Sequence, residues 1–216
     1  MSAPLLIKEL NGSIYSPYSS PDGIYPVKSE APAKVDAYKY PHAKLRRHIE
    51  ATDVMAAAQW FAESILPGIL IHNPRILYNL KGAEYFYRLL RVFNKELVAE
   101  PIRVTTATKE QKQFGEINSD KLQWVDKPVA GRPVLVLDDI NDTGRTLAYI
   151  VNRLVSEQAQ AITTASLYQR KLKTESLYLP TYALLQLPTE GFWVGTGLDD
   201  GTDEYRMLTY LYDLLG

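Results

Sequence analysis

Segments that read as strands and segments that read as helices alternate along most of this chain, and this alternation limits the possible folds more than any other feature. Apolar runs of about four to eight residues predict buried strands, whereas apolar residues spaced three and four apart predict amphipathic helices. We expect strands at residues 75–80, 101–106, 133–138, 162–168, 182–187 and 192–195, and helices that begin at Thr52, at Ala83 and at Gly144. Such an alternation indicates βαβ units, so the predicted fold is α/β, with a central, mostly parallel, twisted sheet flanked by helices.

The chain is expected to form one domain preceded by a short arm. Its 216 residues, 46% of them apolar, suffice for one sizeable core. Residues 1–42 are rich in Pro, Ser and Tyr and have no sustained period, which predicts an irregular N-terminal arm. Its tyrosines favour packing on the domain or on a partner subunit, with a disordered tail as the alternative. Residues 43–216 are expected to form a single domain, whose first helix ends before Pro67 and Gly68.

Composition excludes several classes of function. The net charge of -1 gives no reason to expect a surface for a polyanion, which argues against nucleic-acid binding as the main role. The chain has no cysteine and three histidines, which argues against disulfides, thiolate chemistry and a zinc site. No apolar run approaches the roughly 18 residues of a membrane span, and no secretory leader is visible. A cytoplasmic protein is therefore expected.

The stretch VLVLDDINDTGRTL, residues 134–147, joins a buried strand to two carboxylates, Asp138 and Asp139. Two adjacent charges at the end of a buried strand are costly unless a ligand needs them. Gly144 permits a tight turn before the next helix, where backbone N–H groups favour an anion. The Walker pattern is absent, and the carboxylates suit neutral hydroxyls, which need acceptors, or a metal ion. This predicts a phosphate-binding turn, and the alternative is an acidic turn that only caps a helix.

The same stretch resembles the phosphoribosyl-pyrophosphate signature of type I phosphoribosyltransferases. The resemblance implies that family's fold, with a small hood formed by N- and C-terminal segments over the sheet. It also implies that Asp138 and Asp139 bind the ribose hydroxyls. The residues implied to surround the 5'-phosphate are Asp142, Thr143, Gly144, Arg145 and Thr146.

Two further segments resemble the hypoxanthine-guanine branch of that family. The sequence NLKG matches its pyrophosphate-binding loop at Leu80, Lys81 and Gly82, although a Lys-Gly pair after a strand is often only a turn. The sequence GFWVGTGLDDGTDEYRML matches its C-terminal stretch, in which an aspartate approaches Mg²⁺ through water and an arginine meets pyrophosphate. The resemblance assigns these roles to Asp199 and Arg206, with Asp138 and Asp139 also near the metal ion.

The resemblance also indicates where the base binds. Phe192 would stack on a purine and Trp193 lies beside it, although aromatic residues at strand ends more often pack in a core. A lysine of the family that contacts the purine's exocyclic oxygen corresponds to Arg170, with Lys171 next to it. Either cation can donate to a 6-oxo group, and neither suits the 6-amino group of adenine.

The implied reaction transfers the phosphoribosyl group of phosphoribosyl pyrophosphate to N9 of hypoxanthine, guanine or xanthine and releases pyrophosphate, as in purine salvage. Mg²⁺ is the implied cofactor, Asp142 is the implied acid/base at purine N7, and family members are usually homodimers or homotetramers. The chain departs from the family at the mobile loop, where Thr106 and Ala107 replace a Ser-Tyr pair, and at Thr196, which replaces a tyrosine. Two alternatives stay open: a regulator that only senses phosphoribosyl pyrophosphate, and a transferase that uses a different base.

Overall fold

The computed structural model of the chain describes residues 44–104, 122–171, 176–200, 204–206, 208 and 210–215. In chain order its elements are β1 Lys44–Ile49, α2 Ala51–Trp60, the π-helical turn η1 Phe61–Ile65, α3 Leu66–Leu70, β2 Arg75–Asn79, α4 Ala83–Phe93, β3 Glu100–Ile102, β4 Pro133–Asn141, α5 Arg145–Ser156, β5 Ala161–Arg170, β6 Tyr182–Leu187, β7 Trp193–Val194 and β8 Leu211–Leu215. The predicted arm, residues 1–42, and the loop positions Thr106 and Ala107 lie outside the described residues.

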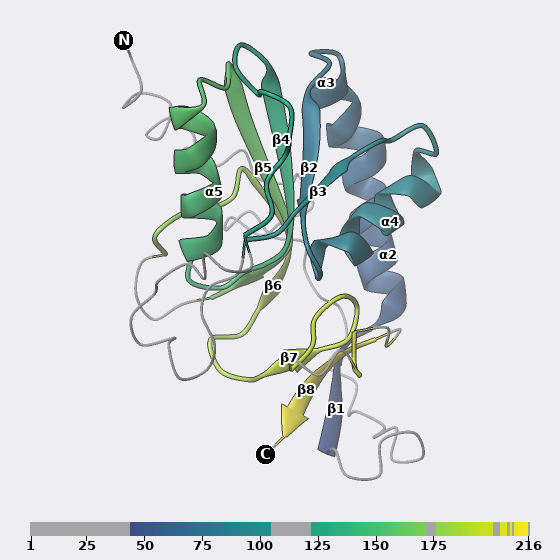
Figure 1. The fold of residues 1–216 in the computed structure, drawn as a ribbon. Helices are drawn as coiled ribbons and strands as arrows, with labels where there is room; N and C mark the ends of the chain where they lie inside the picture. The colour runs from purple at the N-terminus through teal and green to yellow at the C-terminus, as the bar shows by residue number, and fades with distance from the viewer. Residues whose placement is uncertain are drawn as a thin grey trace.

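The centre of the molecule is a five-stranded parallel sheet with helices on both faces. Its strand order is β3-β2-β4-β5-β6, and every neighbouring pair in it is parallel. Helices α2, α3 and α4 cover one face and α5 covers the other, so that the sheet forms the middle of three layers (Figure 1). This arrangement confirms the predicted α/β fold.

Strand β4 contributes to both layers of the core. Leu135 and Leu137 pack in the cluster under α2 and α4, whereas Val134 and Val136 pack in the cluster under α5. Successive side chains of a strand point to opposite faces, so a strand covered on both faces must be apolar throughout. The continuous apolar run before Asp138 therefore reflects burial on both sides of the sheet.

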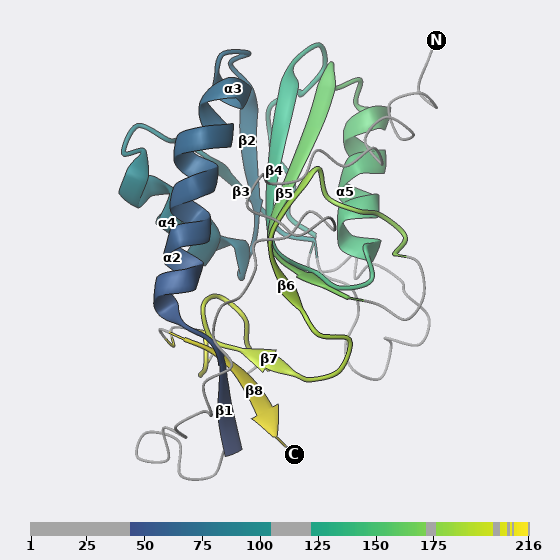
Figure 2. The same ribbon diagram turned by 180° about the vertical axis from the view of Figure 1, so that it is seen from behind.

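A second, smaller sheet forms a hood beside the carboxyl ends of the parallel strands. Its order is β1-β8-β7 and both of its strand pairs are antiparallel. Figure 2 shows β1 and β8 side by side below the large sheet, although they come from opposite ends of the described chain. The predicted hood of N- and C-terminal segments is therefore present, and it takes in the 192–195 segment as β7.

The structure corrects several expected boundaries, among them those of β5, which spans Ala161–Arg170, and β7, which spans Trp193–Val194. The first helix does not end before Pro67 and Gly68, because it continues through η1 into α3. Pro67 lies in the first turn of α3, where a missing N–H costs little. Strand β3 ends at Ile102, while β4 runs to Asn141, because Ile140 and Asn141 still pair with β5. Strands β1 and β8 were not among the expected strands, although the resemblance implied a hood of terminal segments. Among the described residues, no helix is long and apolar enough to cross a bilayer.

Candidate active site

The candidate site lies where the strand order of the large sheet reverses. From β2 the chain passes to β3 on one side and then to β4 on the other side of β2. The loops after β2 and β4 therefore diverge from each other, and in open α/β sheets ligands bind in the crevice that this divergence leaves. A cavity of about 370 Å³ opens at this point.

Most of the residues singled out from the sequence line this one cavity. They come from the loop after β2, from the end of β4 and its turn, from the end of β5 and from the hood. The residues are Leu80, Lys81, Gly82, Asp139, Asp142, Thr146, Arg170, Phe192, Trp193, Asp199 and Arg206. Segments separated by up to 126 positions (206 minus 80) thus meet around one space.

The other predicted residues lie near the cavity without lining it. Asp138 is buried below it with an exposed fraction of 2%, and Gly144 is buried in the turn after β4. Thr143 and Lys171 are exposed, and Arg145 is half-buried. Of the two candidate base-binding cations, the structure therefore brings Arg170 and not Lys171 to the cavity.

Asn79, at the end of β2, orients the first of the two carboxylates. Its Nδ2 donates to Oδ1 of Asp138 at 3.2 Å, and its Oδ1 accepts the backbone N–H of Val104 at 2.9 Å. Burial raises the pKa of Asp138 well above its usual value, and the neighbouring Asp139 raises it further. The motifs did not single out Asn79, but an amide at the end of an otherwise apolar strand was a usable signal.

Substitution of Asp138 by Asn is expected to stabilise the folded protein at neutral pH. Because the folded-state pKa of Asp138 is raised, its contribution to stability is full below the unfolded-state pKa and is lost as the pH rises through the folded-state pKa. Asparagine stays neutral and can still accept from Asn79. We therefore expect a higher Tm than wild type at neutral pH and a vanishing difference near about pH 4.

Thermal unfolding of Asp138→Asn across that pH range measures the effect. The control is Asp126→Asn, which makes the same change at an exposed position away from the cavity. A lower Tm for Asp138→Asn than for wild type at neutral pH would contradict the expectation.

Gly82 lets the start of α4 approach the second carboxylate. It has helical backbone angles at the N-cap of α4, and a Cβ built on it would overlap the carboxylate of Asp139. Burial raises the pKa of Asp139 and the charge of Arg206 opposes this rise. The predicted pyrophosphate loop and the predicted ribose-binding acid are thus in direct contact.

The turn after β4 is held by the segment that precedes β6. Gly144 has φ +79°, and a Cβ there would overlap the backbone of Tyr178. The carbonyl of Thr143 accepts the N–H of Leu177 at 3.0 Å, and Asn141 Nδ2 donates to the carbonyl of Tyr178 at 2.9 Å. The N-terminus of α5, a helix of 12 residues, therefore follows a rigid turn suited to an anion.

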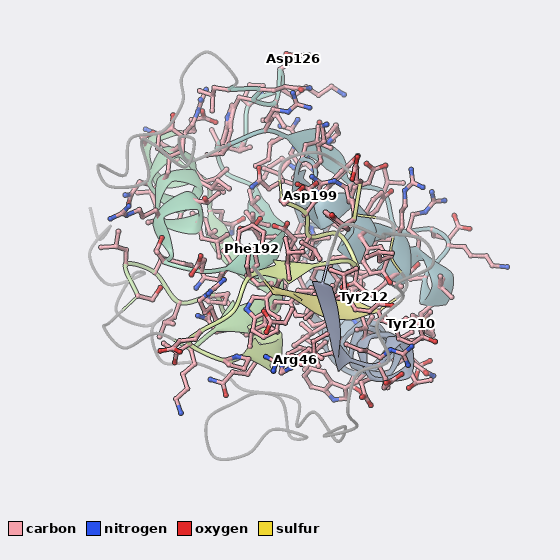
Figure 3. All side chains as sticks on the ribbon, turned by 90° about the horizontal axis from the view of Figure 1, so that it is seen from below. Arg46, Asp126, Phe192, Asp199, Tyr210 and Tyr212 are labelled. Atoms are coloured by element: carbon pink, nitrogen blue, oxygen red, sulfur yellow. The ribbon has the colours of Figure 1, made fainter. Side chains whose placement is uncertain are left out.

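The hood contributes a carboxylate and a guanidinium to the lining of the cavity. Asp199 and Arg206 form an ion pair, and the Arg206 guanidinium donates to the carbonyl of Gly197 at 2.6 Å. Burial lowers the pKa of Arg206, and the carboxylate of Asp139 opposes this shift. Viewed from below, Asp199 and Phe192 lie near the centre of the molecule, whereas Asp126 lies at its periphery (Figure 3).

Arg170 lies between Asp142, the predicted proton acceptor, and the residues predicted to bind the purine. Its Nε lies 3.0 Å from Oδ1 of Asp142, and its guanidinium donates to the carbonyl of Gly191 at 3.0 Å. Next along the chain come half-buried Phe192 and buried Trp193, whose ring centroid is 4.5 Å from that of His48. The corner thus holds a cation, a carboxylate and two aromatic rings.

The donor atoms at the cavity suit Mg²⁺ that is bound together with a substrate. Among the described residues, no three His, Cys, Asp or Glu side chains gather into a complete metal cage. Mg²⁺ commonly takes one or two carboxylates and completes its shell with water and substrate phosphates. Asp139 and Asp199, which both line the cavity, provide carboxylates of that kind.

Comparison with known proteins identifies the family. The phosphoribosyl transferase domain family matches residues 81–200, which is more than half of the chain. A hypoxanthine-guanine phosphoribosyltransferase from Streptococcus pyogenes is 28% identical over 164 residues, which cover 74% of this chain and 87% of the relative. The bifunctional protein TilS/HprT of Listeria innocua is 30% identical over 140 residues, or 64% of this chain, and the match spans 21% of that longer protein.

Solved structures share the fold. A hypoxanthine phosphoribosyltransferase from Staphylococcus aureus superposes with a TM-score of 0.70 at 20% identity, covering 84% of this chain and 97% of that one. A hypoxanthine-guanine phosphoribosyltransferase from Bacillus anthracis gives 0.66 at 21% identity, covering 78% and 98%. With the family match and the arrangement of the cavity, these similarities lead to one conclusion: the chain is a member of the phosphoribosyl transferase domain family.

Proposed function

We propose that this protein transfers the phosphoribosyl group of phosphoribosyl pyrophosphate to N9 of a 6-oxopurine and releases pyrophosphate. The observation that carries this proposal is the pairing of Arg170 with Asp142 at 3.0 Å, in the same cavity as Lys81 and Asp139. A donor of hydrogen bonds, an acid/base and groups for a charged sugar phosphate are thus within reach of one another. The names of the Streptococcus and Staphylococcus relatives point to the same chemistry.

The donor substrate is expected to lie across the carboxyl ends of β2 and β4. The turn of Thr143, Gly144, Arg145 and Thr146 binds the 5'-phosphate through backbone N–H groups at the start of α5. Asp138 and Asp139 orient the ribose hydroxyls, with Asn79 fixing Asp138 from below. Leu80, Lys81 and Gly82 on one wall and Arg206 on the other bind pyrophosphate.

The acceptor is expected to lie between the end of β5 and the hood. Phe192 stacks on the base, with Trp193 beside it, and Arg170 donates to the 6-oxo group. Asp142, which lies next to Arg170, accepts the N7 proton of the base as N9 forms its bond to C1' and pyrophosphate leaves. The cavity orients both reactants, which is the main contribution expected for a reaction with an oxocarbenium-like transition state.

Mg²⁺ is the proposed cofactor, and the residues that would hold it are Asp199, through water, together with Asp138 and Asp139. When bound, it would supply positive charge that neutralises the leaving pyrophosphate. Residues 43–216 as a single domain, residues 1–42 as an irregular arm, a homodimer or homotetramer and a cytoplasmic location remain predictions from the sequence.

The direct test is a panel of acceptor bases. The protein is incubated with phosphoribosyl pyrophosphate, Mg²⁺ and one of hypoxanthine, guanine, xanthine, adenine, uracil or orotate, and pyrophosphate release is measured. Release with at least one 6-oxopurine, and none with adenine, supports the proposal. Binding of phosphoribosyl pyrophosphate without release for any base would instead support the sensor, and release with uracil or orotate alone would indicate a different acceptor.

Substitution of Arg170 by Gln is expected to raise the KM for the base by about 10-fold to 100-fold. The reason is the loss of a charged hydrogen-bond donor, which contributes about 1.5–3 kcal/mol. The Kd for phosphoribosyl pyrophosphate should change little.

Steady-state kinetics and calorimetry measure the two quantities, and Lys171→Gln is the matched comparison. Because Lys171 is exposed and does not line the cavity, its substitution should have the smaller effect. The reverse order would assign base recognition to Lys171.

A further inference from the structure

The hood loop that leads to Asp199 has an unusual backbone. Three consecutive residues have positive φ: Gly195 at +96°, Thr196 at +49° and Gly197 at +102°. Glycine adopts such angles freely, but a β-branched residue rarely does, and holding it there costs free energy. Contacts around Thr196 must therefore stabilise this conformation.

The side chain of Tyr168 supplies one of these contacts from the central sheet. Tyr168 lies on β5, is fully buried, and its hydroxyl is 2.6 Å from Oγ1 of Thr196. The Thr196 hydroxyl donates to the carbonyl of Gly195 at 2.8 Å, so its oxygen accepts the hydrogen bond that the Tyr168 hydroxyl donates. Burial raises the pKa of the Tyr168 hydroxyl, which keeps it protonated as the donor. The backbone N–H of Thr196 donates to the carbonyl of Leu208 at 2.9 Å, which is a further contact that holds this residue.

The loop held in this way determines where the hood meets the cavity. The N–H of Gly197 donates to the carbonyl of Arg206 at 3.0 Å, and the Arg206 guanidinium donates to the carbonyl of Gly197 at 2.6 Å. Arg206 also forms the ion pair with Asp199. On its other side Gly197 packs so closely on Gly82 that an added Cβ would lie 2.8 Å from the Gly82 carbonyl oxygen. A change of backbone angles at Thr196 would therefore move the Asp199 and Arg206 pair relative to Lys81 and Gly82.

We propose that Tyr168 is a positioning residue for pyrophosphate binding, acting through Thr196 on Asp199 and Arg206. Tyr168 does not line the cavity, so its effect is indirect. The inference rests on the proposed function in one respect, namely that pyrophosphate is the group bound between the hood and the loop after β2. It adds that a buried hydroxyl of the central sheet controls the affinity for that group.

The test measures the affinity for pyrophosphate in the presence of Mg²⁺ by calorimetry, without any base or turnover. Tyr168→Phe and Thr196→Val, which each break the hydrogen bond, are expected to weaken binding by about 5-fold to 10-fold, the effect of one neutral hydrogen bond. Thr196→Ser keeps the hydroxyl and should bind as wild type does. Tyr182→Phe, which removes a hydroxyl on neighbouring β6 away from the cavity, is the matched control and should also bind normally.

A double variant separates positioning from general stability. Glycine reaches a positive φ without help, so Tyr168→Phe combined with Thr196→Gly should bind pyrophosphate more tightly than Tyr168→Phe alone. If Tyr168 only stabilises the fold, the double variant should bind pyrophosphate less tightly than Tyr168→Phe alone, because two contacts are lost instead of one. Thr196→Val and Thr196→Ser decide the question by themselves if Tyr168→Phe does not fold.

The possible failures are distinguishable. If wild type binds pyrophosphate and Tyr168→Phe binds it equally well, with only a lower Tm, the positioning role is wrong and the proposed function stands. If wild type binds neither pyrophosphate nor phosphoribosyl pyrophosphate with Mg²⁺, the proposed function fails and this inference fails with it.

Discussion

Substitution of Asp142 by Asn is expected to lower kcat by about 10²-fold to 10⁴-fold, the usual contribution of a general acid or base. Asparagine keeps the shape of the side chain but cannot take up or release the N7 proton. The Kd for phosphoribosyl pyrophosphate should change only a few-fold, because Asp142 pairs with Arg170, which is assigned to the base. The half-exposed ion pair with Arg170 contributes little to stability, so the variant should fold normally.

Single-turnover kinetics and calorimetry together measure this separation of rate and affinity. Asp126→Asn, at an exposed site outside the cavity, is the control for the chemical change itself. Equal losses in kcat and in affinity for phosphoribosyl pyrophosphate would remove the acid/base role and leave Asp142 as a binding residue.

Substitution of Gly144 by Ala is expected to weaken binding of phosphoribosyl pyrophosphate at least about 100-fold. The new methyl group would overlap the backbone of Tyr178, so the turn must move and its N–H groups lose the phosphate, each such charged hydrogen bond contributing about 1.5–3 kcal/mol. The positive φ adds a further cost of roughly 1–2 kcal/mol to folding.

Gly131 offers a matched control, because it has φ +69° and no atom within 4 Å of an added Cβ. Gly131→Ala should therefore lower the free energy of unfolding by a similar amount, because alanine at positive φ is strained there too. Its affinity for phosphoribosyl pyrophosphate should be unchanged. Calorimetric binding and denaturant unfolding of both variants measure the two effects. Comparable affinities for the two variants would show that the turn of Gly144 does not bind the phosphate.

Local patterns in the sequence were sufficient for the elements of the large sheet and for the family. Helix α4 and strand β6 lie at the residues expected for them, because the apolar repeat of each matches the face that it buries. The signature at residues 134–147 is equally local, since strand, turn and helix follow one another directly. The assignment to type I phosphoribosyltransferases on that signature is confirmed by the family match.

Local patterns failed where a contact joins distant parts of the chain. Strands β1 and β8 pair Arg46 with Asp213, 167 positions apart, and neither strand has an alternation clear enough to predict it alone. The continuation of the first helix through Pro67 also depends on context, because Leu66 is buried in the core beside it.

Residue types and their spacing specified the chemistry available to this protein: the acids at the end of β4, the glycines that bring backbone close to a ligand, and the cations at the ends of β2 and β5. Which of these groups share one cavity depended on tertiary packing. It brought Arg170 to Asp142 and left Lys171 exposed, and it joined Tyr168 to Thr196 across the boundary between sheet and hood. The physical reason is that residue types and spacing specify local backbone and charge, whereas the distance between two side chains depends on how remote segments pack.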